Sequence, residues 1–259
     1  MLEGVISEKE VKPRRIILYG VGGIGKSTWA AMAPNVIFVQ TEDGLSDIDP
    51  ALAPRFPVSS TFDEVMINLA KLHQGKHSFS TLAIDSGDWL EKLIWRKVCE
   101  DKRVQNIEDI GYAKGYQFAI DYWRQFVDAL NWLRRDRGMM VVIIIHSQVA
   151  RFEDPMTESY DRYILQLNKH ANALLVQWAD EVLFATYKKY TKSEKQGFNQ
   201  ERTIGMGAGE RVVYTTERPS HIAKNRLNLP DELPLVWAEY QKYLPKIVTP
   251  ETKKEQVHG

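Results

Sequence analysis

The sequence contains one cysteine, Cys99, and carries no net charge, since 34 Lys and Arg residues balance 34 Asp and Glu residues. A lone cysteine excludes a disulfide within the chain and is typical of reducing compartments. With zero net charge, any site for nucleic acid or a membrane surface must be local. The longest apolar run, 139–145, is far shorter than the ~20 residues of a membrane helix, and the stretch MLEGVISEKEVKPRR lacks the apolar core of a signal peptide. We therefore expect a soluble, intracellular protein.

Apolar strand-like stretches alternate with stretches of helical periodicity along the chain. The run VVIII at 141–145 is typical of a strand covered on both faces. In 117–132, apolar residues recur every three or four positions, which indicates the core-facing side of a helix. The alternation predicts one α/β domain with a largely parallel sheet over residues 14–240, between an N-terminal tail (1–13) and a C-terminal tail (241–259). The strand candidates are 15–19, 36–41, 81–85, 140–149, 181–188 and 211–216.

Residues 14–27, RRIILYGVGGIGKS, place an apolar strand before a glycine-rich loop that fits the P-loop pattern. Glycines let several backbone N–H groups turn onto one anion, and the following helix adds its positive dipole end. Lys26 would reach the β- and γ-phosphates, and the Ser27 hydroxyl would ligate Mg²⁺. The flanking strand and helix disfavour the alternative of a chance glycine-rich turn, so the loop predicts binding of a nucleoside triphosphate. The predicted nucleotide contacts are Gly20, Val21, Gly22, Gly23, Ile24, Gly25, Lys26, Ser27 and Thr28.

Acidic residues end two further predicted strands. TLAIDS (81–86) ends with Asp85, which we expect to hold Mg²⁺ together with Ser27. The alternative role, capping the next helix, suits Asp88 better. VIFVQTEDG (36–44) ends with Glu42 and Asp43. Because such sites lie at strand carboxyl ends, Glu42 is the predicted general base for the attacking water, whereas a solvated turn explains Asp43.

The predicted strand 140–149 ends in His146, Ser147 and Gln148. A neutral amide at this place can sense the γ-phosphate and pass its presence to the following loop, so Gln148 is the predicted sensor. His146 receives no role, because a lone histidine is more often packed or hydrogen-bonded than catalytic.

The order of these motifs resembles the RecA-like ATPases. Within that group, the sequence resembles phage-encoded ATP-binding proteins related to the RecA-like single-strand annealing recombinases of bacteriophages. The resemblance implies a RecA-like P-loop fold with a mostly parallel central sheet, flanking helices and a C-terminal antiparallel extension. It also implies ATP hydrolysis with Mg²⁺, self-assembly into a ring or filament with shared ATP sites, and a cytoplasmic location in the bacterial host. The stretches that carry it are 41–49 (TEDGLSDID), 88–95 (DWLEKLIW), 107–116 (IEDIGYAKGY), 146–163 (HSQVARFEDPMTESYDRY) and 223–235 (AKNRLNLPDELPL).

A Lys-x-Arg pair follows from the same resemblance. In ring helicases of the RecA class, such a pair reaches the γ-phosphate held by the neighbouring subunit, and Lys224 and Arg226 stand in that position here. A guanidinium delivered across an interface can stabilise the charge that develops in phosphoryl transfer. The alternative is two solvated basic residues before a turn.

Two loops correspond to those with which RecA-like recombinases hold single-stranded DNA, at 106–115 and 149–165. The first offers aromatic and basic side chains for stacking and phosphate contact. The second also carries four acidic residues, which argue against a simple phosphate track. A lysine-rich, hairpin-like stretch beginning at Lys188 is a further candidate. The candidate DNA contacts are Tyr112, Lys114, Arg151, Phe152, Lys188 and Lys189.

Three functions fit these observations. The first is an oligomeric ATPase that acts on single-stranded DNA in phage recombination or annealing, with a single-strand DNA-binding protein as a further partner. The second is a ring helicase or helicase-loading ATPase, which the Lys-x-Arg pair fits equally well. The third is a nucleotide-gated binding module without DNA, which suits the zero net charge.

Overall fold

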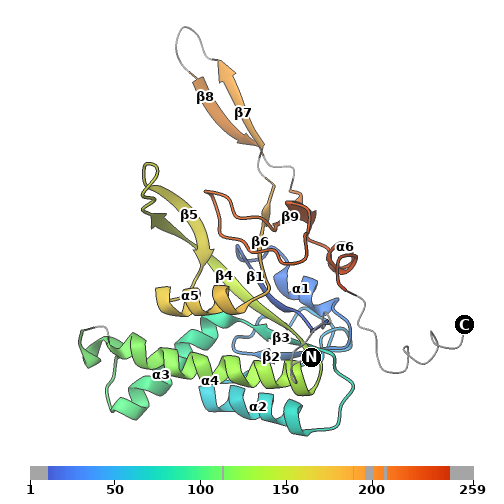
Figure 1. Cartoon of the computed structure of the whole chain (residues 1–259), viewed down its shortest axis with the longest axis vertical. Coiled ribbons are helices and arrows are strands. Elements are labelled where there is room, and N and C mark those ends of the chain that lie inside the picture. The colour runs from blue at the N-terminus through green and yellow to red at the C-terminus, as the bar shows by residue number, and fades with distance from the viewer. Residues whose placement is uncertain (1–10, 113, 189, 196–200, 207–208, 246–259) are drawn as a thin grey trace, which may run out of the picture.

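The computed structural model describes residues 11–112, 114–188, 190–195, 201–206 and 209–245, so most of both predicted tails lies outside the described residues. The body of the protein is one sheet with helices on both faces (Figure 1). The strands follow the spatial order β10-β9-β6-β1-β4-β3-β2, and β5 pairs with β4 off this path. The strands of this sheet are β1 (Arg15–Gly20), β2 (Val36–Gln40), β3 (Thr81–Asp85), β4 (Met140–Phe152), β5 (Tyr160–Leu165), β6 (Glu181–Tyr187), β9 (Arg211–Tyr214) and β10 (Glu232–Pro234).

The five adjacent strands β2, β3, β4, β1 and β6 run parallel to one another, with β2 at the edge of the sheet. Parallel neighbours need crossover connections, which helices supply along most of this chain. On the other side of β6, strands β9 and β10 add in antiparallel order. The predicted α/β class is therefore confirmed, with a mostly parallel sheet and an antiparallel extension toward the C-terminus.

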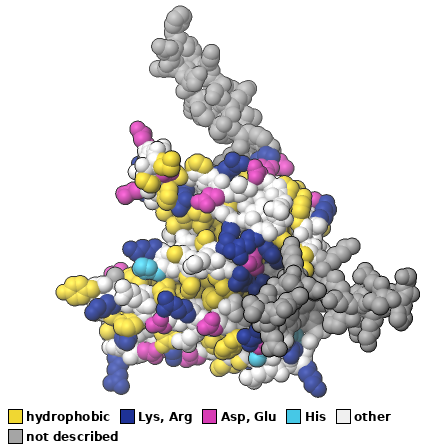
Figure 2. Space-filling model, in the orientation of Figure 1, with side chains coloured by type: hydrophobic (Ala, Val, Ile, Leu, Met, Phe, Trp, Pro, Cys, Tyr) yellow, Lys and Arg dark blue, Asp and Glu magenta, His cyan; other side chains and the backbone are white. Residues whose placement is uncertain are grey.

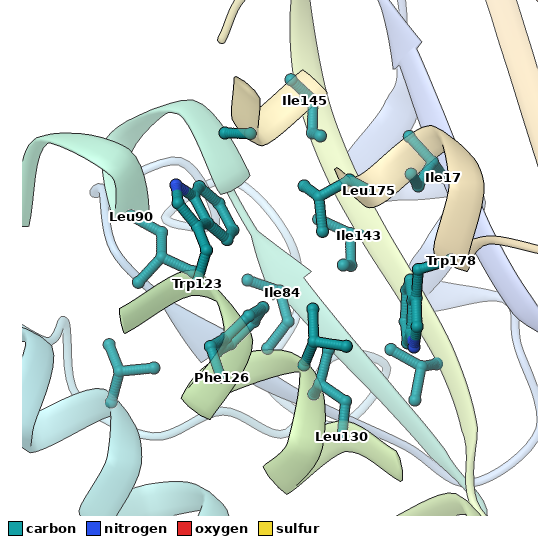
Figure 3. Packing of buried hydrophobic residues seen from close by; sticks show 14 of the residues in the cluster. Ile17, Ile84, Leu90, Trp123, Phe126, Leu130, Ile143, Ile145, Leu175 and Trp178 are labelled. Atoms are coloured by element: carbon teal, nitrogen blue, oxygen red, sulfur yellow. The ribbon is translucent and has the colours of Figure 1, made fainter. Parts of the chain in front are cut away.

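Helices cover the sheet through two separate hydrophobic clusters. Successive residues of β1 alternate between them: Ile17 belongs to the larger cluster and Ile16 to the smaller one. Figure 3 shows part of the larger cluster, where Trp123 and Phe126 of α4 pack beside Ile84 of the sheet. This burial on both faces explains why the strands read as unbroken apolar runs. The helices are α1 (Lys26–Ala31), α2 (Phe62–Gln74), α3 (Gly87–Lys102), α4 (Lys114–Asp136), α5 (Lys169–Trp178), α6 (Trp237–Gln241) and the 3₁₀ helix η1 (Ile107–Ile110).

Two hairpins extend from this body (Figure 1). Strand β4 continues to Phe152, beyond its predicted end, and its extension pairs antiparallel with β5. The predicted loop 149–165 is therefore a hairpin, and the charged residues in YDRYIL conceal its strand pattern in the sequence. The hairpin-like stretch after Lys188 is the antiparallel pair β7 (Tyr190–Lys195) and β8 (Glu201–Met206). Within the described residues, no helix is both long and apolar enough to cross a membrane.

Two buried acids hold the amino-terminal ends of two neighbouring parallel strands together. The Asp180 carboxylate accepts hydrogen bonds from Arg15 Nη2 at 2.8 Å and from the Arg15 backbone N at 3.1 Å. Glu181, which is fully buried, pairs with Arg14. Burial disfavours ionised Asp180, but the Arg15 hydrogen bond and the charges of Arg15, Arg14 and Arg134 outweigh it and lower the pKa of that carboxyl. These ion pairs join the start of β1 to the start of β6.

We expect Asp180→Ala to lower the free energy of unfolding by about 3 kcal/mol, because Arg15 would lose its partner in a largely buried site. Urea denaturation at pH 7 measures this loss. Asp121→Ala, which breaks an exposed ion pair with Arg124, serves as the matched control and should cost less than about 1 kcal/mol. The pKa of Asp180 is lowered by folding, so its contribution should be lost as pH falls through the folded-state pKa. Equal losses in the two variants would contradict the proposed importance of this site.

Candidate functional site

The glycine-rich loop connects the end of β1 to the start of α1, at the carboxyl edge of the parallel strands. Strand pairing brings Gly20 level with His146 of β4 and Ala185 of β6. A Cβ atom on Gly20 would lie 2.0 Å from the Ala185 carbonyl oxygen, so only glycine fits there. Gly25 caps α1 with φ of 101°, in the left-handed region that favours glycine. Gly22, in contrast, has open space where a Cβ would lie.

Lys26 is buried inside the curve of this loop. Its Nζ donates to the carbonyl oxygens of Gly20 at 3.1 Å and Val21 at 3.0 Å. Burial lowers the pKa of Lys26, and the charges of Asp85, Asp88 and Glu42 oppose that change. The neighbouring acids therefore offset only part of the free-energy cost of burying the ammonium group. This suits a group that meets an anionic ligand.

Asp85, the last residue of β3, is buried beside the loop. Burial raises its pKa to about 6, with a hydrogen bond from Ser27 and the charge of Lys26 opposing and Glu42 adding to the increase. Its Oδ2 is buried without a hydrogen-bond partner among the described residues. A carboxylate oxygen and a hydroxyl are ligands that Mg²⁺ prefers, and Mg²⁺ commonly joins one or two protein oxygens to substrate phosphates. The residues present therefore fit a magnesium–nucleotide complex.

Thr41 fastens the end of β2 to the end of β3. Its backbone N donates to the Asp85 carbonyl oxygen at 2.8 Å, and its Oγ1 donates to the Ser86 carbonyl oxygen at 2.7 Å. Glu42 follows directly and is half-buried, and its charge acts on Asp85, Lys26 and His146. Asp43 is exposed. Thr41 thus holds the predicted general base next to the predicted magnesium ligand.

The predicted sensor Gln148 is engaged elsewhere. Its Nε2 donates to the carbonyl oxygens of Leu165 at 3.2 Å and Leu167 at 3.4 Å, at and just beyond the carboxyl end of β5. His146, which received no role from the sequence, is instead the β4 residue level with Gly20.

Asp88 has a different role from the predicted one. The residue that caps α3 is Ser86, and the Asp88 carboxylate accepts from the His146 backbone N at 3.0 Å and lies 3.1 Å from His146 Nδ1. The expectation that Asp88 caps the helix was wrong. The physical reason is close packing: a Cβ on Gly87 would lie only 3.0 Å from the Ile145 side chain, so the first turn of α3 presses against β4.

Arg211 is a site residue that sequence reasoning missed. It begins β9, opposite Tyr187 of β6, and its Nη1 donates to the Ile24 carbonyl oxygen at 3.4 Å. The same atom lies 2.9 Å from where a Cβ on Gly25 would be. Arg211 therefore brings a second cation to the P-loop, but only through antiparallel pairing between distant segments, for which the sequence carries no local signal.

Lys224 and Arg226 lie near the amino-terminal ends of the parallel strands, away from the P-loop. Lys224 pairs with Val182 early in β6, and its Nζ donates to carbonyl oxygens in the last turn of α5. Arg226 Nη1 is 3.4 Å from Asp180 Oδ1, and the side chain is 54% exposed. Figure 2 shows Lys and Arg side chains gathered near the middle of the face that it presents. Because Asp180 is level with the start of β1, neither residue is brought to the P-loop of its own chain.

The candidate DNA contacts on the β4–β5 hairpin are paired within the protein. Arg151 lies 3.6 Å from Asp161 on the opposite strand. Phe152 has the Arg162 guanidinium over its ring at 3.7 Å, and Arg162 also pairs with Glu217 at 3.2 Å. These contacts neutralise much of the positive charge that a phosphate track would need.

The remaining DNA candidates differ in availability. Tyr112 is 95% exposed at the corner between η1 and α4, and Lys114 is exposed at the start of α4. Lys188 pairs with Glu232, and Lys189 lies outside the described residues. Among the candidates that the structure describes, the corner at Tyr112 is therefore the most accessible.

We expect Gly20→Ala to lower the free energy of unfolding by about 3 kcal/mol or more, because the added methyl would overlap the Ala185 carbonyl. Gly22→Ala, at a position with open space, should change it by less than about 1 kcal/mol. Chemical denaturation of both variants without nucleotide measures the difference. A Gly20→Ala protein as stable as Gly22→Ala would contradict the close approach of β1 and β6.

Comparisons with known proteins place this site in a family. Residues 12–227 match the model of a family described as an AAA domain. Among solved structures, a crystal structure of the RadB recombinase is similar, with a TM-score of 0.46 and 16% sequence identity, covering 79% of this chain and 81% of that one. No curated protein matches the chain. Because the family model covers most of the chain and includes the glycine-rich loop, the protein belongs to this family of AAA-type P-loop domains.

Proposed function

We propose that the protein is an ATPase that binds ATP with Mg²⁺ at the carboxyl edge of its sheet and hydrolyses it. The observation that carries the proposal is the meeting of two buried, opposite charges at the glycine-rich loop. The Lys26 ammonium and the Asp85 carboxylate are both buried beside the glycine-rich loop, where their charges interact, and Asp85 Oδ2 has no hydrogen-bond partner among the described residues. Each would regain a strong electrostatic partner when the nucleotide and its cation bind.

The side chains divide the reaction between them. Lys26 would hold the β- and γ-phosphates, and Ser27 and Asp85 would position Mg²⁺, which neutralises charge on the phosphate oxygens. Glu42 would accept a proton from the water that attacks the γ-phosphorus, as the bond to the β–γ bridging oxygen breaks and ADP leaves. Thr41 keeps Glu42 in place through its bonds to β3.

We further propose that Lys224 and Arg226 act on the ATP of a neighbouring subunit in a ring or filament. Two observations support a role in trans. Both residues lie toward the edge of the sheet opposite their own P-loop, and Arg226 is more than half exposed despite its contact with Asp180. A guanidinium from a second subunit would stabilise charge on the transferring phosphoryl group.

The proposed task is a RecA-like one on single-stranded DNA, in phage recombination or annealing, with a single-strand DNA-binding protein as a further partner. The motif order and the exposed aromatic and basic corner at Tyr112 and Lys114 support it. The paired charges of the β4–β5 hairpin favour the alternative of a nucleotide-gated module that does not bind DNA.

ATPase rates with and without single-stranded DNA, together with the mass of the assembly in a non-hydrolysable ATP analogue, test this function. We expect single-stranded DNA to raise the ATPase rate, and we expect the assembly to have a mass several times that of one chain.

Lys26→Ala should remain folded but lose nucleotide binding. Glu42→Gln should bind ATP normally and hydrolyse it about 10²–10⁴-fold more slowly, because the amide cannot take a proton.

The outcomes separate the alternatives. Wild-type nucleotide affinity in folded Lys26→Ala would remove the proposed ATP site. A loss of hydrolysis in Asp43→Asn but not in Glu42→Gln would identify Asp43 as the base. Hydrolysis without stimulation by DNA and without assembly would favour the DNA-free module.

Subunit mixing tests the role in trans. Arg226→Ala should bind ATP at its own P-loop yet lose most hydrolysis, and mixing it with Lys26→Ala should restore part of the activity. A mixed interface pairs an intact P-loop with an intact Arg226, which neither variant has alone. Native mass spectrometry must show mixed assemblies. Near-normal hydrolysis by Arg226→Ala, or no recovery once exchange is demonstrated, would rule out a shared site.

A further inference from the structure

We propose that His146, held by Asp88, is the group in this chain that detects the γ-phosphate, and that the paired carboxylates of α3 transmit its position to the β4–β5 hairpin. The inference rests on the proposed ATP site and assigns its regulation. It concerns four side chains, His146, Asp88, Glu91 and Asn168, of which only Asp88 had an expected role.

The position of His146 suits a phosphate contact. Strand pairing holds its backbone level with Gly20, the first residue of the P-loop. The ring Nδ1 lies 3.1 Å from Asp88 Oδ2. If the two share a proton, Nε2 is the ring nitrogen that remains for a phosphate contact. The side chain is 32% exposed. The charges of Lys26 and Glu42 act on this ring, as does that of Asp88. His146 is therefore near enough to Lys26, the group that would hold the γ-phosphate, for their charges to interact.

His146 and Asp88 shift each other's pKa in opposite directions. The hydrogen bond with Asp88 raises the pKa of His146, burial opposes it, and the Asp88 charge adds to the increase. For Asp88, burial opposes ionisation, but the hydrogen bonds from His146 outweigh it and lower the pKa. An imidazole ring held beside the P-loop would gain a contact with ATP that ADP, which lacks the γ-phosphate, does not offer.

Helix α3 connects the His146–Asp88 pair to the segment just after β5, where the hairpin returns to the sheet. Asp88 and Glu91 are three residues apart, so both project from one side of the helix. The Glu91 carboxylate accepts from the Asn168 backbone N with both oxygens, at 2.9 and 3.1 Å. Asn168 in turn caps α5, since its side chain accepts from the His170 backbone N at 3.1 Å.

The two carboxylates therefore fasten both ends of the hairpin to one helix. The hairpin leaves the sheet just after His146 and returns at Leu165, shortly before Asn168. Glu91 is buried, so this connection is shielded from solvent, and burial raises the pKa of Glu91 to about 7 with the Asn168 hydrogen bond opposing. A shift of His146 toward a phosphate would change the pull on Asp88, and α3 would pass that change to Asn168.

The first test compares nucleotide affinities in His146→Ala and in His170→Ala, an exposed histidine at the start of α5. Wild type and His170→Ala should bind a non-hydrolysable ATP analogue more tightly than ADP. His146→Ala should bind ADP within about twofold of wild type and lose about tenfold of its preference for the analogue, within the usual range of such couplings. Thermal unfolding checks that all three proteins are folded.

The second test measures the hairpin directly. A spin label on Met156→Cys, in a Cys99→Ser background, reports motion at a position that is 94% exposed. In the otherwise wild-type protein, the analogue should change the label mobility relative to ADP. Adding His146→Ala should abolish that difference. Adding Glu91→Ala should abolish it while the preference for the analogue persists, and Glu91→Gln, which keeps an oxygen acceptor for Asn168, should restore part of it.

The outcomes separate this inference from the proposed function. If the wild-type protein binds neither ADP nor the analogue, the ATP site itself fails. If it binds both and His146→Ala matches His170→Ala in preference and label response, His146 is not the detector. A full label response in folded Glu91→Ala would contradict transmission through α3.

Discussion

The parallel pairing of β1 between β4 and β6 is the constraint on which the rest of this protein depends. It brings Gly20 so close to the Ala185 carbonyl that no side chain fits, and it places the P-loop at the edge where β2, β3 and β4 also end. Parallel strands carry their carboxyl ends to one side, so residues from four separate segments meet there. The chemistry of the site follows from this geometry more than from any single residue.

The cost of this geometry is a cluster of poorly hydrated charges. Burial lowers the pKa of Lys26 and raises that of Asp85 to about 6, while the hydrogen bonds from His146 help to lower the pKa of Asp88 against its burial. Buried ionisable groups are expensive unless they are paired, and here the pairing within the protein is incomplete. Local departures of this kind are expected where a protein binds a charged ligand. This arrangement of the acids and the lysine is consistent with the proposed binding of phosphate and a cation.

The opposite edge of the sheet shows the contrasting arrangement. Asp180 and Glu181 are satisfied by Arg15 and Arg14, and these pairs join β1 to β6. Arg226 also contacts Asp180 but remains more than half exposed. If Arg226 moved away, the Asp180 carboxylate would still be paired with Arg15. An edge that is stable in one subunit and can present a cation to another is consistent with the proposed shared site.

Features that depend on neighbours along the chain can be predicted from the sequence. The P-loop is readable because glycine, lysine and serine must follow at fixed spacing, and Glu42 and Asp85 stand out because they end apolar strands. Tertiary structure alone decided which polar residues meet across strands. His146 is level with Gly20, Gln148 bonds to the carboxyl end of β5, and Asp88 faces β4 instead of capping its helix. Arg211 reaches the P-loop from a strand far along the chain. These contacts depend on strand register and helix packing, whose long-range partners leave no periodic or local signal in the sequence.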